Sequence, residues 1–247
     1  MRKDALGFFW RDEPVVKETK EVHKVVPPKP VWLYPTYLPY LDRALEFAAN
    51  APTDGRCYTD SELLELARRK DSGERIELVC DTEVYSNYFC AAFKNPESGK
   101  CIYVEQFNDG WADPEADLLK LDWLLKTFTI VTFNGNSYDL PILAVALAAR
   151  TTQEIKSVSD QIILEGKSPW EVLRPFKAKK LQIDHVDLIE VAPLRGSLKT
   201  YSGRIHCQRM QDLPFAPDVA LSNKQRAVVL YYCVNDLDNT IAMLTTL

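Results

Sequence analysis

The chain has 247 residues, 46% of them hydrophobic, and a formal net charge of −5. This is enough for one sizeable core with a small appendage, and no apolar run is long enough to cross a bilayer. The N-terminus shows no secretory signal, and the six cysteines lack C-x-x-C spacing, which predicts reduced thiols in a cytoplasmic protein. The acidic balance counts against a protein that grips long duplex DNA through surface charge.

Residues 1–72 are predicted to form an N-terminal extension that is rich in proline and aromatic residues. Its segment 23–35 contains several prolines, which interrupt a regular helix. We expect this segment to run extended and to pack on its own domain through Trp32 and Tyr34. The alternative is a polyproline-type ligand for a partner protein.

Two short helices are expected at the end of the extension, over residues 38–49 and 60–69. Thr59 begins a capping-box pattern for the second of them. Near residue 73 the pattern changes to an alternation of strands and helices, so residues 73–247 are predicted to form the main domain.

The main domain is expected to begin with three strands in an antiparallel meander, because the glycine and polar residues between them permit tight returns. An amphipathic helix, a buried strand, an apolar helix, two shorter helices, a short strand and a long final helix should follow. In chain order these elements are predicted at residues 75–82, 87–94, 101–107, 113–127, 128–133, 140–150, 152–165, 168–174, 184–188 and 223–246. The order of strands and helices predicts an α/β fold.

Four carboxylates lie where an unpaired charge is costly. Asp81 and Glu83 end the first strand, and they point to the same face because strand side chains alternate. Asp139 lies at the start of the apolar helix, and Asp236 falls within the apolar stripe of the final helix. Four acids without matching bases indicate a site for hard cations such as Mg²⁺.

Each acid also has a simpler structural interpretation. The first pair could be solvated at the end of its strand, Asp139 could cap its helix, and Asp236 could pair with a buried Lys or Arg. The final helix favours the metal site, since Tyr232 lies one turn before Asp236 on the same side whereas Asp238 falls on the solvent side.

The segments that hold these acids resemble the three motifs of the DEDD family of 3′–5′ exonucleases. Asp81-Thr82-Glu83 matches the first motif, D-x-E. Asn134 followed by Tyr138-Asp139 matches the second, and Tyr232 with Asp236 matches the tyrosine form of the third. The motifs occur in the family's order, and this part of the chain is similar to proofreading domains of DNA polymerases, including those of bacteriophages.

The resemblance implies a ribonuclease-H-like mixed sheet, an antiparallel meander plus parallel strands, flanked by helices. It implies a two-metal-ion 3′–5′ exonuclease that hydrolyses DNA to nucleoside 5′-monophosphates and proofreads for a replicative polymerase. Two Mg²⁺ or Mn²⁺ ions would be held by the four acids. The implied catalytic residues are Asp81, Glu83, Asp139, Tyr232 and Asp236. The implied contacts to the DNA strand are Thr82, Phe133, Asn134 and Tyr138.

The expected partners are the 3′ end of single-stranded DNA and a DNA polymerase, either on a separate chain or in a removed C-terminal part. A free-standing viral protein would act in the host cytoplasm. Two alternatives stay open: a non-catalytic module that binds single strands or docks a polymerase, and an RNA-trimming exonuclease. Basic side chains that could follow the DNA backbone, or could be ordinary surface, are Arg195, Lys199, Arg204 and Arg209. The basic run 177–180 is interpreted as a solvated loop.

Overall fold

A computed structural model describes the chain in five stretches, residues 2–3, 9–10, 41–193, 196–207 and 209–247. The chain divides into two compact units, Met1–Tyr34 and Pro35–Leu247. In the first unit, strand β1 (Arg2–Lys3) pairs antiparallel with β2 (Phe9–Trp10). The predictions for the proline-rich segment 23–35, with Trp32 and Tyr34, lie outside the described residues, and so does the one for Arg195.

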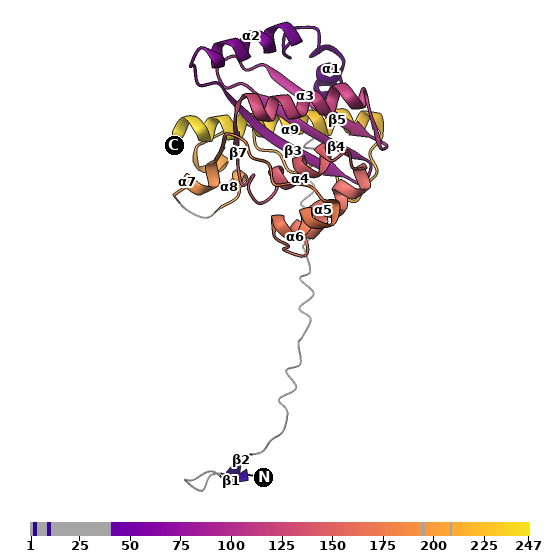
Figure 1. The fold of residues 1–247 in the computed structure, drawn as a ribbon, viewed down its shortest axis with the longest axis vertical. Coiled ribbons are helices and arrows are strands. Elements are labelled where there is room, and N and C mark those ends of the chain that lie inside the picture. The colour runs from indigo at the N-terminus through magenta and orange to yellow at the C-terminus, as the bar shows by residue number, and fades with distance from the viewer. Residues whose placement is uncertain (1, 4–8, 11–40, 194–195, 208) are drawn as a thin grey trace. The chain divides into compact units, whose positions relative to one another are not determined.

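The second unit is built on a six-stranded mixed sheet in the order β6-β5-β4-β3-β7-β8 (Figure 1). The strands are β3 (Glu77–Tyr85), β4 (Tyr88–Lys94), β5 (Cys101–Phe107), β6 (Gly110–Trp111), β7 (Thr129–Thr132) and β8 (His185–Asp187). Strands β3 to β6 form an antiparallel meander, and β7 and β8 run parallel to β3. The predicted α/β fold, a mixed sheet consistent with a ribonuclease-H-like arrangement, is confirmed.

Helices cover both faces of this sheet. Their bounds are α1 (Leu41–Asn50), α2 (Asp60–Asp71), α3 (Pro114–Thr127), α4 (Asp139–Leu147), α5 (Thr152–Ile163), α6 (Pro169–Leu173), the 3₁₀ helix η3 (Arg174–Phe176), α7 (Leu188–Val191), α8 (Leu198–Arg204) and α9 (Asn223–Thr246). One hydrophobic cluster packs the helices α2, α3, α4, α5 and α6 against one face of the sheet. A second cluster packs α1, α8 and α9 against the other face. Figure 1 shows α3 and α9 on opposite sides of the sheet.

The short helices that the sequence placed in the extension share the core of this unit. Phe47 of α1 is buried in the cluster with α9, and Leu63 and Leu66 of α2 are buried in the cluster on the opposite face. The predicted capping box is present, since the Thr59 hydroxyl accepts from the backbone N–H of Glu62. Residues from α1 onward therefore pack against the sheet.

Several elements differ from the sequence prediction. The first strand was expected to stop at Thr82, but β3 continues to Tyr85 because its last residues are apolar and buried. The two-residue strand β6 was not predicted, and it follows a turn in which Asn108 and Asp109 adopt positive φ. The apolar helix was expected to reach residue 150, but α4 ends at Leu147, shortly before a residue in the left-handed region.

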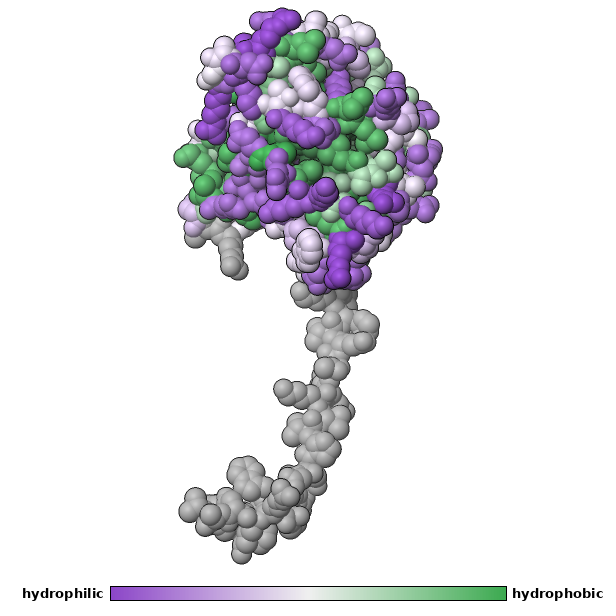
Figure 2. Space-filling model, in the orientation of Figure 1, coloured by the Kyte–Doolittle hydropathy of each residue, from purple (hydrophilic) through white to green (hydrophobic). Residues whose placement is uncertain are grey.

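The surface of the second unit mixes polar and apolar side chains. Apolar side chains lie at the centre of the face in Figure 2, among hydrophilic ones. Large exposed hydrophobic side chains include Leu64 and Leu119 on α2 and α3, and Ile163, Leu164 and Trp170 around the turn from α5 to α6. No helix in the described part of the chain is long and apolar enough to cross a membrane.

Candidate metal centre

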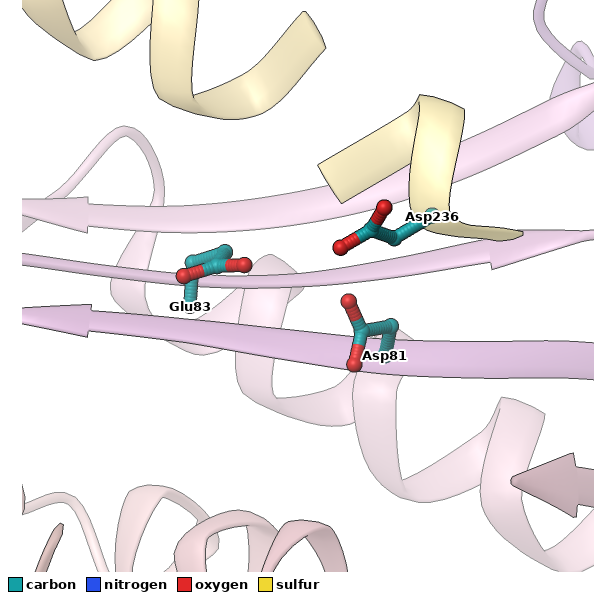
Figure 3. A group of neighbouring side chains, drawn as sticks. All are labelled: Asp81, Glu83 and Asp236. Carbon is teal, nitrogen blue, oxygen red and sulfur yellow. The ribbon is translucent and has the colours of Figure 1, made fainter. Parts of the chain in front are cut away.

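Three of the four predicted acids converge between strand β3 and helix α9. One carboxylate oxygen each from Asp81, Glu83 and Asp236 lies within 4.8 Å of the others. Figure 3 shows the first two side chains leaving the strand and the third coming down from the helix toward them. Asp236 is buried, with 6% of its surface exposed, and the other two are half-buried. The resulting site is a compact group of oxygen atoms.

The sequence positions these acids through two simple patterns. Alternation along β3 puts Asp81 and Glu83 on the face that α9 covers, together with the buried Val79 and Tyr85. On α9, the buried stripe that packs on this face contains Val229, Cys233 and Leu237. Asp236 lies beside this stripe, as helical periodicity predicted. Asp238 faces solvent, where its carboxylate pairs with Lys94.

Burial and mutual repulsion make these carboxylates hard to ionise without a cation. Burial, then the charges of Asp139 and Asp236, raises the pKa of Asp81 well above its usual value. Burial, then the charge of Asp81, does the same to the pKa of Glu83. Burial also raises the pKa of Asp236. Clustered buried acids of this kind must either hold protons or bind a positive charge.

Asp139 lies outside this group of three. It is the first residue of α4, and its carboxylate accepts a hydrogen bond of 2.6 Å from the Thr82 hydroxyl. Thr82 points to the face of β3 opposite Asp81, so its buried side chain holds Asp139 close to the acids without joining them. Burial raises the pKa of Asp139 to about 7, and the Thr82 hydrogen bond lowers it. The helix-capping interpretation is not borne out, because Tyr138 occupies the N-cap position.

The environment of Asp236 contains the polar groups that the third motif predicted. Tyr232 is buried one turn earlier on α9, and its hydrogen bond to Asp236 lowers the pKa of that carboxyl. The charge of Lys199 and the amide of Asn239 lower it further. Burial, then the charges of Glu83 and Asp236, raises the pKa of Tyr232, so its hydroxyl stays protonated.

Arg204 and Arg209, which the sequence named as possible DNA contacts, interact with aromatic side chains of the protein itself. The Arg204 guanidinium lies 5.6 Å from the Tyr201 ring centroid, and Arg209 donates to the Tyr231 hydroxyl at 3.3 Å. The Lys199 ammonium lies 5.5 Å from the ring centroid of Tyr232, which brings a positive charge to the edge of the acid group.

The loop between β7 and α4 holds the residues of the second motif. Asn134 adopts a positive φ of 66°, and the Tyr138 hydroxyl lies 2.9 Å from the Ser159 hydroxyl of α5. Phe133 packs on the ring of Tyr201 with centroids 6.0 Å apart. The loop therefore has one side fixed to α5 and the other to α8.

Asp187 organises this loop, a role that sequence reasoning left undecided. It is buried at the end of β8, and its carboxylate accepts the backbone N–H groups of Asn134 at 2.6 Å and Asn136 at 2.9 Å. It also caps α7 through the N–H of Ile189. The sequence signal was an acid that ends a short buried strand, but its partners lie about 50 residues earlier.

Gly135 is required by close packing in the same loop, and we expect Gly135→Ala to destabilise the protein by about 2 kcal/mol or more. An added Cβ would lie 2.1 Å from the Thr132 hydroxyl, which is fully buried and 2.8 Å from Nε2 of His185. Urea denaturation measures the loss. Gly110→Ala is the control, since its Cβ would make an ordinary 3.5 Å contact, and an equal loss in both variants would contradict the packing argument.

The donor set fits a hard divalent cation. Mg²⁺ and Mn²⁺ prefer carboxylate oxygens, and three such groups from Asp81, Glu83 and Asp236 come within 4.8 Å of one another. Burial and mutual repulsion raise the pKa values of Asp81 and Glu83, and a bound cation would offset both effects. Asp139, held by Thr82, lies outside this set of three.

Comparisons with known proteins gave no match to the chain among protein-family models, curated proteins or solved structures.

Proposed function

We propose that this protein is a metal-dependent 3′–5′ exonuclease that releases nucleoside 5′-monophosphates from the 3′ end of single-stranded DNA. The observation that carries the proposal is the convergence of Asp81, Glu83 and Asp236 within 4.8 Å at a half-buried site. The three motif segments supply the second support, because they come together in space around these acids. We further propose that the enzyme proofreads for a DNA polymerase.

Two Mg²⁺ or Mn²⁺ ions bound at such carboxylates would activate a water molecule and stabilise the leaving oxygen. Asp81 would serve both positions, since one of its carboxylate oxygens lies within 4.8 Å of those of Glu83 and Asp236, and the hydroxyl of the next residue, Thr82, bonds Asp139. Glu83 and Asp236 would complete the first position, and Asp139 the second. Asn134 and Tyr138 border the site from the β7–α4 loop and would position the strand that is cut.

In the proposed reaction a water oxygen forms a bond to the terminal phosphorus and the bond from phosphorus to the 3′ oxygen breaks. The departing 3′ oxygen takes up a proton, and the nucleotide leaves with its phosphate on the 5′ side. The Tyr232 hydroxyl would orient the water by a hydrogen bond. It is a poor base at neutral pH, because its pKa is raised above the usual value of about 10.

We expect Tyr232→Phe to reduce the cleavage rate about tenfold to a hundredfold, because the water would lose a positioning contact. Binding of DNA should be unchanged, since the ring remains in place. Single-turnover cleavage and binding in EDTA measure the two effects. Tyr231→Phe is the matched control, because its ring packs on Phe47 and its hydroxyl bonds Arg209. Equal rates for Tyr232→Phe and wild type would contradict this role.

The direct test is digestion of a 5′-labelled single-stranded oligonucleotide with Mn²⁺, together with an unlabelled one whose products are identified by chromatography. The proposal predicts a ladder that shortens from the 3′ end, nucleoside 5′-monophosphates as products, and no reaction in EDTA. DNA binding without cleavage would favour a non-catalytic module. Faster digestion of RNA than of DNA would favour the RNA-trimming alternative.

A further inference from the structure

A cavity of about 580 Å³ lies between the β7–α4 loop, which leads into Asp139, and the turn from α5 to α6. Its lining includes Asn134 and Tyr138 on one side and Ile163, Lys167 and Pro169 on the other. A volume of this size is typical of a small-molecule or nucleotide site.

Tyr138 connects the cavity to the acids, because it lines the cavity and directly precedes Asp139. Burial raises the pKa of this tyrosine, and the charges of Glu83, Asp139 and Asp81 raise it further, so its phenol lies close to these acids. The same phenol is held by the Ser159 hydroxyl of α5, which fixes the wall between the two spaces. A chain with its end at the acids would pass Tyr138 into this cavity.

An unusual group of apolar side chains surrounds the turn from α5 to α6. Trp170 is 72% exposed, and Ile163 and Leu164 are 63% and 76% exposed. An indole that is open to solvent contributes little to the fold, but it offers a flat face on which a nucleobase can stack. Trp170 directly follows Pro169, which lines the cavity.

The chain that leaves this turn is basic, although the protein as a whole has a net charge of −5. Exposed cations on and after η3 that have no ion-pair partner within the described part of the chain are Arg174, Lys177, Lys179 and Lys180. Exposed, unneutralised cations of this kind suit the phosphates of a nucleic acid.

The α6–η3 segment leads away from the acids. Pro169, at the start of α6, lies near the beginning of α4, where Asp139 is located. Phe176, at the end of η3, accepts a hydrogen bond of 3.1 Å from Arg150, beyond the C-terminal end of α4. The α6–η3 segment therefore runs alongside α4, from the metal centre outward.

We infer that the turn from α5 to α6 and the α6–η3 segment bind the single-stranded DNA that leads to the 3′ end. The three nucleotides nearest the 3′ end would lie at the acids and in the cavity, the next base would stack on Trp170, and the phosphates beyond would meet Arg174 and Lys177. This inference rests on the proposed function, because the acids define where the 3′ end lies. Lys177, Lys179 and Lys180 lie in an exposed loop, as the sequence predicted, and this inference gives the loop a ligand.

The stacking contact is tested with Trp170→Ala and with Leu119→Ala, an exposed apolar side chain on α3, as the control. Fluorescence anisotropy in EDTA gives the dissociation constants for labelled oligothymidines of three and ten nucleotides. Trp170→Ala should weaken binding of the ten-mer about tenfold and leave the three-mer and its Mn²⁺-dependent cleavage nearly unchanged. Both variants should keep the wild-type melting temperature, because both side chains are exposed.

The phosphate contacts are tested by the salt dependence of ten-mer binding in the double variant Arg174→Gln/Lys177→Gln. Each lost phosphate contact should reduce the slope of log affinity against log salt by about 0.7. Lys126→Gln is the control, since Lys126 is exposed on α3 and already pairs with Asp122. An unchanged slope in the double variant would remove these cations from the strand path.

The outcomes separate the two proposals. If the wild-type protein cleaves DNA, but Trp170→Ala and the double variant bind the ten-mer as tightly as their controls, the strand path is wrong and the exonuclease proposal stands. If the wild-type protein neither binds nor cleaves single-stranded DNA, both are overturned. Weaker binding of the ten-mer alone, with cleavage of the three-mer retained, supports the strand path.

Discussion

Asp81→Asn is expected to reduce metal-dependent cleavage of single-stranded DNA by about 10³-fold or more. A bound cation contributes several kcal/mol to the transition state, and each 1.36 kcal/mol is worth a factor of ten in rate. Asp81 is chosen because one of its carboxylate oxygens lies within 4.8 Å of those of both Glu83 and Asp236. The change keeps the shape of the side chain, so loss of activity reports the charge. Single-turnover cleavage at saturating Mn²⁺ measures it.

The matched control is Asp238→Asn, two residues after Asp236 on the same helix. The Asp238 carboxylate is half exposed and pairs with Lys94 outside the acid group, so the variant should cut at nearly the wild-type rate. Full activity in Asp81→Asn, or an equal loss in both variants, would contradict the assignment of the site.

The second prediction with a large expected effect concerns the free energy of unfolding in the absence of divalent ions. The folded-state pKa of Asp139 is raised to about 7, above its usual value near 4, and those of Asp81 and Glu83 are also raised. The folded protein then binds more protons than the unfolded chain in this interval. The protonated carboxyl groups therefore favour the folded protein fully below pH 4. This contribution to the free energy of unfolding is lost as the pH rises to about 7.

In EDTA we expect the free energy of unfolding to fall by a few kcal/mol between pH 5 and pH 8, because each pKa unit is worth about 1.4 kcal/mol. Mn²⁺ should restore stability at pH 8, by about 2.7 kcal/mol at a hundred times its dissociation constant, and much less at pH 5. Urea denaturation at the two pH values, with and without Mn²⁺, gives these quantities.

The variant Asp139→Asn should flatten this pH dependence and be more stable than wild type at pH 8 in EDTA. The amide oxygen of asparagine can still accept the Thr82 hydrogen bond, so the change removes mainly the buried charge. Glu115→Gln, at an exposed position on α3, should retain the wild-type pH dependence. A free energy of unfolding that depends on neither pH nor Mn²⁺ would contradict the cluster of buried acids described above.

Local patterns in the sequence predicted most of the fold. The capping box at Thr59 located the start of α2, and the apolar stripe of α9 placed Asp236 in the buried region. Alternation predicted that Asp81 and Glu83 share a face of β3. These features depend on neighbours within a few residues, which is why sequence alone was sufficient.

The remaining features depend on contacts between distant segments. Asp139 accepts a hydrogen bond from Thr82 instead of capping α4, and Asp187 at the end of β8 holds the loop that follows the neighbouring strand β7. No periodicity or turn signal encodes which of these segments come together.

The most direct test of the central claim is a calorimetric titration of the metal-free protein with Mn²⁺ at pH 7.5, in wild type, Asp81→Asn and Asp238→Asn. The account predicts that wild type and Asp238→Asn bind at least one ion, and that Asp81→Asn loses this binding. A wild-type protein that binds no Mn²⁺ at millimolar concentration, or an Asp81→Asn variant that binds it equally well, would contradict the assignment of these carboxylates as a metal centre.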